Sequence, residues 1–180
     1  TEAILAPLLS GFTRARLFAE AGSVWNWLST QSPPLIPRNV SWTALLQGYA
    51  TSRSNSVGTV TSIEETWDQM LQAGILPDAR AWATRVEGYF NAKEWKQAMI
   101  LINQLSKKTS LVNLEGGVEY APKMYAKIVV GLLKNGQGGS ASEVLEGMER
   151  NGVQPTIELL NALLAHHAFG KSPDFPAIIS

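Results

Sequence analysis

The stretch that decides the fold is Trp42-Thr-Ala-Leu-Leu-Gln-Gly48-Tyr49, in which a glycine follows an aromatic residue by six positions and precedes a large apolar residue. The same spacing returns at Trp82-x5-Gly88-Tyr89 and at Tyr125-x5-Gly131-Leu132, with a looser copy at Leu5-x5-Gly11-Phe12. A signal that recurs at a nearly fixed period indicates an internal repeat, which takes precedence over any reading of the chain as one irregular globule.

A second marker ends the repeating units in the same register. It reads Met70-x3-Gly74-Ile-Leu-Pro-Asp78 and Met148-x3-Gly152-Val-Gln-Pro-Thr156, with Leu35-Ile-Pro37-Arg38 as a looser copy. The two markers together divide the chain into units 2–38, 39–78, 79–121 and 122–156, followed by an incomplete unit 157–180.

Each unit is predicted to be a helix, a turn, a second helix and a stop. In unit 122–156 two apolar stripes follow the i, i+3, i+4, i+7 pattern on either side of the 136–139 turn. Two helices cannot bury both stripes alone, whereas stacking successive pairs can, so the expected fold is an all-α solenoid of stacked antiparallel helix pairs. Glycine inside a helix costs about 1 kcal/mol relative to alanine, so we expect a neighbouring helix to cross close to the backbone at the four repeated glycines.

Two segments interrupt the period. Residues 52–62 lengthen the turn inside the second unit, and residues 109–121 lengthen the linker inside the third. Such segments serve either as surface loops or as docking elements for a partner, and the sequence leaves both open. Helical spacing predicts that four tryptophans outside the repeated motif lie in the core: Trp25, Trp27, Trp67 and Trp95.

Composition narrows the functional classes. The chain has 180 residues, 15 basic and 15 acidic residues and no cysteine, which excludes disulfides, thiolate zinc sites and a thiol nucleophile, and which fits a cytosolic or organelle-matrix protein. The longest apolar run, 128–133, is interrupted by Gly131 and is far too short to span a membrane.

Chemical motifs are weak throughout. The glycine-rich 136–140 stretch lacks the Lys-Ser/Thr of a phosphate loop and falls on a predicted turn. His166 and His167 are the only histidines and have no cysteine or carboxylate pattern around them. We therefore expect no catalytic residues, no cofactor, no metal site and no small-molecule substrate.

The two markers resemble those of the pentatricopeptide repeat family, whose pattern is about 35 residues long and ends in Met-x3-Gly-Ile-x-Pro-Asp. Tetratricopeptide arrays are the near rival, but their Leu-Gly dipeptide and Ala-x3-Phe spacing are not evident. The resemblance implies a right-handed superhelix of about four and a half repeats, in which the first helices line a groove that binds single-stranded RNA. Solenoids need hydrophilic caps, whereas the expected terminal helices are apolar, so we expect this segment to belong to a longer array.

In that family the fifth and the last residues of a repeat read one base. Carried over to this chain, Thr43 with Asp78 forms a family-like pair with a preference for a purine, guanine first. Ala6, Ala83 and Ala126 cannot present a hydrogen bond to a base at the other fifth positions, while Asn161 could, with a partner beyond Ser180. The second residues, Arg80 and Lys123, occupy the place where the family sandwiches bases.

Charge placement supports the same surface. The first fourteen residues of the units hold six basic residues against three acidic ones, Glu2, Glu87 and Glu158, so that the groove side is mildly basic and the remainder acidic. The alternative is that these charges only decorate solvated helix faces. The six basic residues are Arg14, Arg80, Arg85, Lys123, Lys127 and Lys134, and the predicted RNA-binding residues are Thr43, Asp78, Arg80, Lys123, Lys127, Arg14, Lys134 and Asn161.

Two functions remain in view. One is a single-stranded RNA-binding module of a mitochondrial matrix protein that acts on mRNA or rRNA in RNA stability, processing, translation activation or mitoribosome function. The other is a protein-binding scaffold within a large organellar assembly, without sequence-specific RNA reading. A catalytic role is not expected, because the family's enzymes carry their chemistry in an appended domain.

Overall fold

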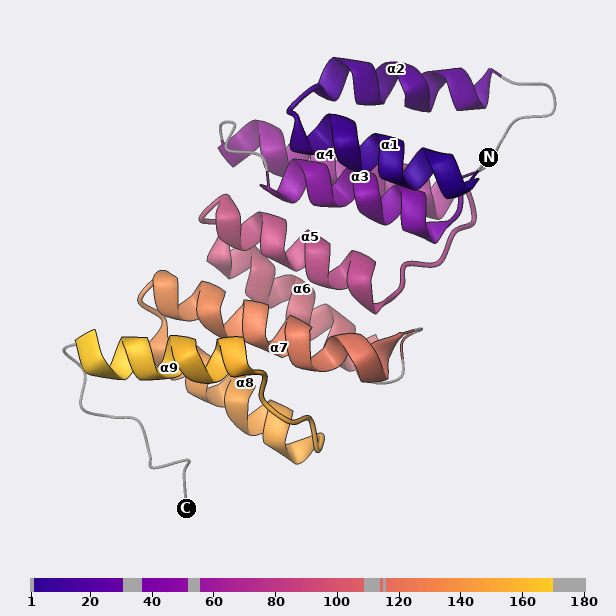
Figure 1. Cartoon of the computed structure of the whole chain (residues 1–180). Coiled ribbons are helices and arrows are strands. Elements are labelled where there is room, and N and C mark those ends of the chain that lie inside the picture. Colours follow the sequence, from indigo (N-terminus) through magenta and orange to yellow (C-terminus); the bar gives the residue numbers. More distant parts are fainter. Residues whose placement is uncertain (1, 31–36, 52–55, 109–113, 115, 170–180) are drawn as a thin grey trace.

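The computed structural model describes residues 2–30, 37–51, 56–108, 114 and 116–169, and every regular element in these ranges is an α-helix. The predicted all-α fold is confirmed (Figure 1). The nine helices of the described ranges are α1 (Glu2–Arg14), α2 (Phe18–Ser29), α3 (Asn39–Thr51), α4 (Ser56–Gln72), α5 (Ala79–Asn91), α6 (Trp95–Lys108), α7 (Gly117–Lys134), α8 (Gly138–Arg150) and α9 (Ile157–Phe169).

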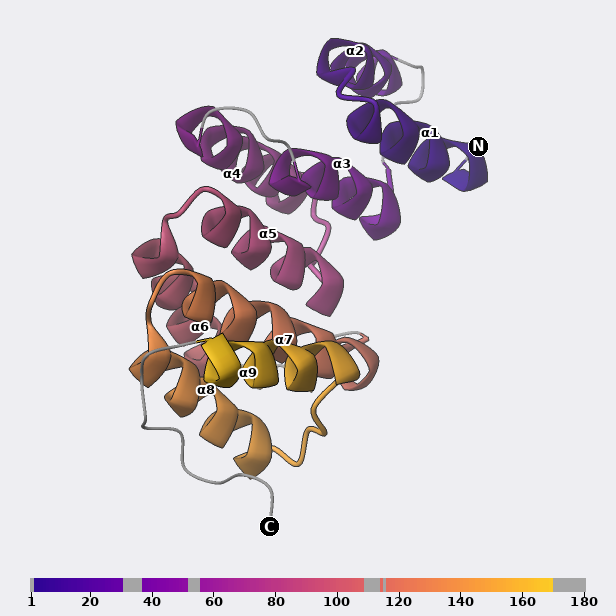
Figure 2. The ribbon, with the colours of Figure 1, turned by 60° about the vertical axis from the view of Figure 1, so that its left-hand side comes forward.

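The helices form two rows. The first helices of the units pack in sequence, α1 on α3, α3 on α5, α5 on α7 and α7 on α9. Each second helix packs against the first helix of its own pair, as α2 does on α1, α4 on α3, α6 on α5 and α8 on α7. Successive pairs are stacked rather than gathered about a common axis (Figures 1 and 2), which confirms the predicted solenoid.

The Met-x3-Gly marker ends the second helices by a defined geometry. After α4, the Ile75 N–H donates to the Met70 carbonyl at 3.1 Å and the Gly74 N–H donates to the Leu71 carbonyl at 2.9 Å. Gly74 has a φ of +74°, in the left-handed region where a side chain is strained. These are the hydrogen bonds of the Schellman motif, and the turn at Gly152 repeats them.

The last residue of the marker starts the next helix. The Asp78 carboxylate accepts a hydrogen bond from the Ala81 N–H at 2.7 Å and caps α5. The Thr156 hydroxyl accepts one from the Leu159 N–H at 3.2 Å at the start of α9. Such caps contribute about 1 kcal/mol each, so one short motif both stops a unit and begins its successor.

The repeated glycines are sites of close helix approach in three of the four units. A Cβ on Gly48 would lie 2.0 Å from the Cβ of Thr13, and one on Gly131 would lie 2.5 Å from the Phe90 ring. A Cβ on Gly88 would meet Ile63 at 2.2 Å. The expectation is wrong for Gly11, which has nothing within 4 Å, because no described helix precedes α1.

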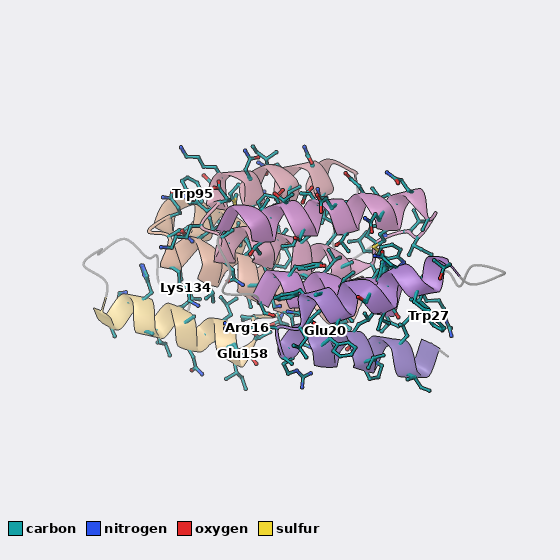
Figure 3. The ribbon with its side chains drawn as sticks, turned by 90° about the horizontal axis from the view of Figure 1, so that it is seen from above. Arg16, Glu20, Trp27, Trp95, Lys134 and Glu158 are labelled. Carbon is teal, nitrogen blue, oxygen red and sulfur yellow. The ribbon has the colours of Figure 1, made fainter. Side chains whose placement is uncertain are left out.

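The core is built from apolar and aromatic side chains shared between pairs. Trp25 packs edge-on against Trp42 with ring centroids 4.4 Å apart, and Trp67 packs against Trp82 at 4.7 Å. Trp27 is 55% exposed near the end of α2, where it lies at the edge of the molecule (Figure 3), so the prediction that it belongs to the core is wrong.

The two predicted insertions contain more helix than expected. Helix α4 already begins at Ser56, and α7 begins at Gly117, ahead of the unit boundary placed at residue 122. The remaining parts of the two insertions, 52–55, 109–113 and 115, lie outside the described residues, as do 31–36 and 170–180. The interruptions of the period are therefore partly longer helices rather than loops.

Candidate nucleic-acid interface

The first helices α3, α5 and α7 each have one stripe of positions on the same side, most of which are partly or fully exposed, while Ala44 and Thr84 are buried. In α5 and α7 the stripe runs at i, i+4, i+7 and i+11, a spacing that keeps side chains on one side of a helix. We call the combined surface the first-helix face, and it consists of Val40, Ala44, Gln47 and Thr51 on α3, Arg80, Thr84, Glu87 and Asn91 on α5, and Lys123, Lys127, Val130 and Lys134 on α7.

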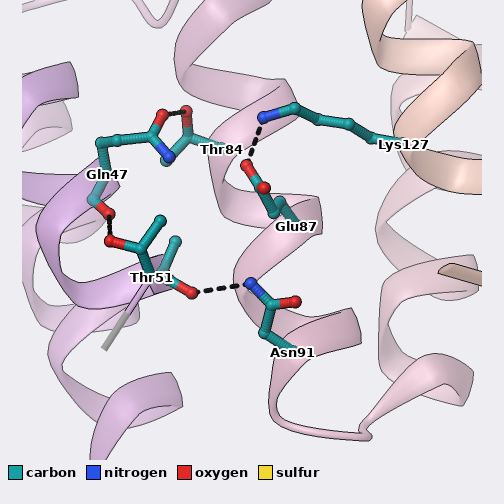
Figure 4. Close-up of polar contacts among 7 residues, drawn as sticks. Gln47, Thr51, Thr84, Glu87, Asn91 and Lys127 are labelled. Atoms are coloured by element: carbon teal, nitrogen blue, oxygen red, sulfur yellow. Dashed lines mark hydrogen bonds and ion pairs between the residues drawn. The ribbon is translucent and has the colours of Figure 1, made fainter. Parts of the chain in front are cut away.

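Polar contacts tie the three helices together along this face (Figure 4). The Thr84 hydroxyl on α5 donates to the Gln47 side-chain oxygen on α3 at 3.3 Å, and the Asn91 amide donates to the Ala50 carbonyl at 2.9 Å. On the other side of α5, the Lys127 ammonium forms an ion pair with the Glu87 carboxylate. Each contact joins neighbouring units, so the face is a continuous polar surface and not three separate stripes.

Positive charge on the first-helix face is concentrated on α7. Lys123 and Lys134 are exposed, and the Lys127 side chain is 38% exposed. The Lys123 ammonium also lies 5.1 Å from the centre of the Tyr120 ring, a weak cation–π contact. The α5 stripe has Arg80 and Glu87, with no excess of either sign, and the α3 stripe is uncharged.

A small depression opens between α5 and α7 on this face. Its volume is about 130 Å³, and its lining includes Glu87, Asn91, Lys127, Lys134 and Asn135 together with Phe90. The volume corresponds to about four water molecules at their share of liquid water. The depression therefore combines two cationic side chains, two amides and one carboxylate within reach of solvent.

The predicted base-reading pair is arranged for packing and capping in this structure. Thr43 is 1% exposed, and its hydroxyl donates to the Asn39 carbonyl at 2.9 Å. Asp78 caps α5, as described above. The fifth positions of α5 and α7, Ala83 and Ala126, are also buried, and Ala6 on α1 is partly buried. The base preference therefore stays a prediction, and the exposed polar side chains of this face stand at other positions.

Two further predicted residues lie toward the ends of the first row. Arg14 is exposed on α1 at the position that Lys134 occupies on α7, and Asn161 is exposed on α9. Helix α1 packs on α3, so Arg14 is not on a helix that packs against α7, whereas α9 packs directly on α7 and places Asn161 on the helix next to the three lysines.

Arg85 corrects the charge count made from the sequence. Its guanidinium Nε donates to the Glu64 carboxylate at 2.8 Å, and its central carbon lies 4.4 Å from the centre of the Trp67 ring. The Arg85 side chain is only 12% exposed and is paired with Glu64 between α4 and α5. Its charge therefore does not add to the first-helix face. Burial, and then the neighbouring Glu64 carboxylate, raise the pKa of Tyr89 in the same cluster to about 12.

The residue that sequence reasoning misjudged is Glu87. The charge count along the chain treats it only as one acidic residue, whereas the structure pairs it with Lys127 of the next unit. The signal was available in principle, because the two opposite charges are 40 residues apart, close to one repeat. A cross-unit pair of that kind can be found from sequence only after the unit register is fixed.

The described ranges contain neither a candidate membrane span nor a candidate metal site. The helices described there include none with the length and apolarity of a membrane span. Among the same residues, no cluster of three or more histidine or carboxylate side chains could hold a metal ion.

Part of the chain is similar in sequence to known proteins. Residues 114–171 match the family model described as a pentatricopeptide repeat domain. A chloroplastic pentatricopeptide repeat-containing protein of Arabidopsis thaliana is 36% identical over 73 residues, which are 41% of this chain and 14% of that protein.

The fold of the chain is similar to the folds of solved structures. The pentatricopeptide repeat protein PPR10 in complex with an 18-nt psaJ RNA element superposes with a TM-score of 0.73 at 22% identity, over 91% of this chain and 22% of PPR10. The pentatricopeptide repeat domain of protein-only RNase P 1 of Arabidopsis thaliana, in complex with tRNA, has a TM-score of 0.65 at 17% identity, over 91% of this chain and 79% of that domain. The chain thus spans less than a quarter of the length of the Arabidopsis relative and of PPR10.

Proposed function

Because this chain belongs to the pentatricopeptide repeat family, we propose that its first-helix face binds single-stranded RNA, chiefly through the phosphate backbone. The observation that carries the proposal is the set of three lysines on the α7 stripe, Lys123, Lys127 and Lys134, with Arg80 on the neighbouring helix. A row of cations along a groove-lining surface is what a sequence-tolerant single-strand binder requires.

The RNA seen with PPR10 and the tRNA seen with protein-only RNase P 1 support this choice of ligand. The predicted contacts Arg14, Arg80, Lys123, Lys127, Lys134 and Asn161 belong to the proposal as backbone or base contacts. Thr43 and Asp78 have structural roles in the free protein. We therefore propose that contacts to phosphates outweigh the reading of bases in this segment.

The proposal extends to an organellar protein, in keeping with the chloroplastic relative. The family resemblance favours the mitochondrial matrix and a role in RNA stability, processing, translation or ribosome function, with mitochondrial mRNA or rRNA as the ligand. Other proteins of an organellar ribonucleoprotein are proposed partners. We propose that the segment has no catalytic activity of its own.

Filter binding of a short single-stranded RNA of mixed sequence tests the proposal. If about four phosphates are contacted, log K should fall with log salt at a slope of roughly −3 between about 50 and about 200 mM salt. A protein that keeps its helical circular dichroism signal but binds no RNA at either salt concentration would contradict it.

A protein-binding role is the second candidate, and exposed apolar side chains favour it. Leu76 is 81% exposed between α4 and α5, Val118 is 77% exposed in the first turn of α7, and Ile157 is 75% exposed at the first residue of α9. Isolated exposed apolar residues are common in proteins, so crosslinking followed by purification is the relevant test. Failure to recover a stable protein partner would count against a scaffold.

A further inference from the structure

We propose that Glu87 competes with RNA phosphates for Lys127 and thereby limits how tightly the first-helix face holds a polyanion; this inference rests on the proposed function. Glu87 is the single acidic residue of the first-helix face as defined above on α3, α5 and α7. It lies on α5, directly opposite the helix that carries the three lysines.

The ion pair is placed where a phosphate would have to enter. The Glu87 and Lys127 side chains are 24% and 38% exposed, so both are accessible from solvent. Both also line the depression between α5 and α7, and Lys134 and Asn91 line it as well. A phosphate entering this depression meets two ammonium groups and one carboxylate at the same time.

The physical consequence is an exchange of one anion for another. Partly exposed ion pairs are weak, so a phosphate can displace the carboxylate from Lys127. The displaced carboxylate stays on the same face, and its negative charge opposes the phosphate in a setting less screened than bulk water. A polyanion that binds at this junction therefore gains less binding free energy than the three lysines of α7 would provide alone.

The other polar groups of the face do not have this effect. The Thr84 and Gln47 contact and the Asn91 and Ala50 contact are between neutral groups, so an incoming phosphate does not have to break an ion pair there. Glu87 thus limits the non-specific affinity for RNA at the junction of α5 and α7. No neutral residue of the face has this effect.

The test compares Glu87→Gln with Glu143→Gln, using the same single-stranded RNA as above. Both changes remove one negative charge, but Glu143 is exposed on α8, in the second-helix row. We expect Glu87→Gln to tighten binding about threefold to tenfold, and to steepen the slope of log K against log salt by about 0.7, the value for one added single-strand phosphate contact. Glu143→Gln should change the affinity less than twofold, about the limit for a screened distant charge.

A double-mutant cycle provides the second readout. Lys127→Gln should weaken binding more in the Glu87→Gln background than in the unaltered protein, because the lysine is then available to phosphate. Two outcomes would overturn the role of Glu87 but leave the proposed function standing. One is equal tightening by Glu87→Gln and Glu143→Gln, and the other is an effect of Lys127→Gln that is the same in both backgrounds. Absence of RNA binding by every variant, with the helical signal intact, would overturn the proposed function and this inference with it.

Discussion

Helices α3 and α7 occupy equivalent places in the solenoid, but the surface of α3 is uncharged and that of α7 is basic. Both have the aromatic residue, the glycine and the large apolar residue of the repeated motif, and both receive a side chain of the preceding first helix on that glycine. Their exposed stripes differ, since α3 presents Val40, Gln47 and Thr51 while α7 presents three lysines. The comparison teaches that the repeat specifies packing, whereas the capacity to bind a ligand is set unit by unit at positions that packing leaves free.

The largest expected effect tests the packing that the two helices share. Gly48→Ala on α3 and Gly131→Ala on α7 should each lower the free energy of unfolding by about 2 kcal/mol, because the clash with Thr13 or Phe90 exceeds the gain in helix propensity. Urea denaturation measures the change.

Gly11→Ala is the matched control, since nothing lies within 4 Å of that position. It should raise the free energy of unfolding by up to about 1 kcal/mol. Destabilisation at Gly11 equal to that at Gly48 would contradict the close-approach account.

The next effect tests the surfaces in which the helices differ. Replacing Lys123 and Lys134 together by Gln should weaken RNA binding about tenfold at low salt, and should make the salt slope shallower by about 1.4, because two phosphate contacts are lost. Fluorescence anisotropy with labelled RNA would show this.

Lys96→Gln serves for comparison, because Lys96 is exposed on α6 in the second-helix row. A loss of affinity per lysine as large as that on α7 would mean that net charge, and not the first-helix face, governs binding.

A third prediction concerns the turns that follow two of the first helices. After α7 the left-handed residue is Gly136, with a φ of +70°, whereas after α5 it is Lys93, with a φ of +65°. Lys93→Gly should therefore raise the free energy of unfolding by about 1 kcal/mol, the strain of a side chain in that region. Thermal unfolding followed by circular dichroism would detect it, and an unchanged or lower midpoint would argue against strain at Lys93.

The smallest effect comes from giving α3 part of the surface of α7. Thr51 holds the position on α3 that Lys134 holds on α7, and it is exposed. Thr51→Lys should tighten RNA binding about threefold and steepen the salt slope by about 0.7.

Gln97→Lys adds the same charge at an exposed position of α6, in the second-helix row. If it tightened binding as much as Thr51→Lys, the first-helix face would have no special role.

Much of the scaffold could be predicted from sequence because its determinants are local. The Gly74 and Gly152 turns and the Asp78 and Thr156 caps each act within a few residues, so a short motif suffices to locate them. The register of the units then follows from the spacing of these motifs. The start of α4 at Ser56 escaped prediction because residues 52–62 contain several serines and threonines and one asparagine that favour caps or turns, and none of them singles out one helix start.

The surface could be predicted only in part, since it depends on what lies across a unit boundary. Lys123 and Lys134 are exposed on α7, and their predicted contacts with RNA stay predictions. Arg85 and Lys127 meet Glu64 and Glu87, which are 21 and 40 residues away in sequence. Such distances are fixed by the stacking of helices, which a count of charges along the chain does not contain.

Mapping the contact between RNA and protein tests the central claim most directly. A single-stranded RNA with photoreactive bases would be crosslinked to the protein, and the modified peptides identified by mass spectrometry. Crosslinks concentrated on the exposed stripes of α5 and α7, around Arg80 and between Lys123 and Lys134, are the predicted result. Crosslinks that fall mainly on the second-helix row, on α6 and α8, would contradict the account.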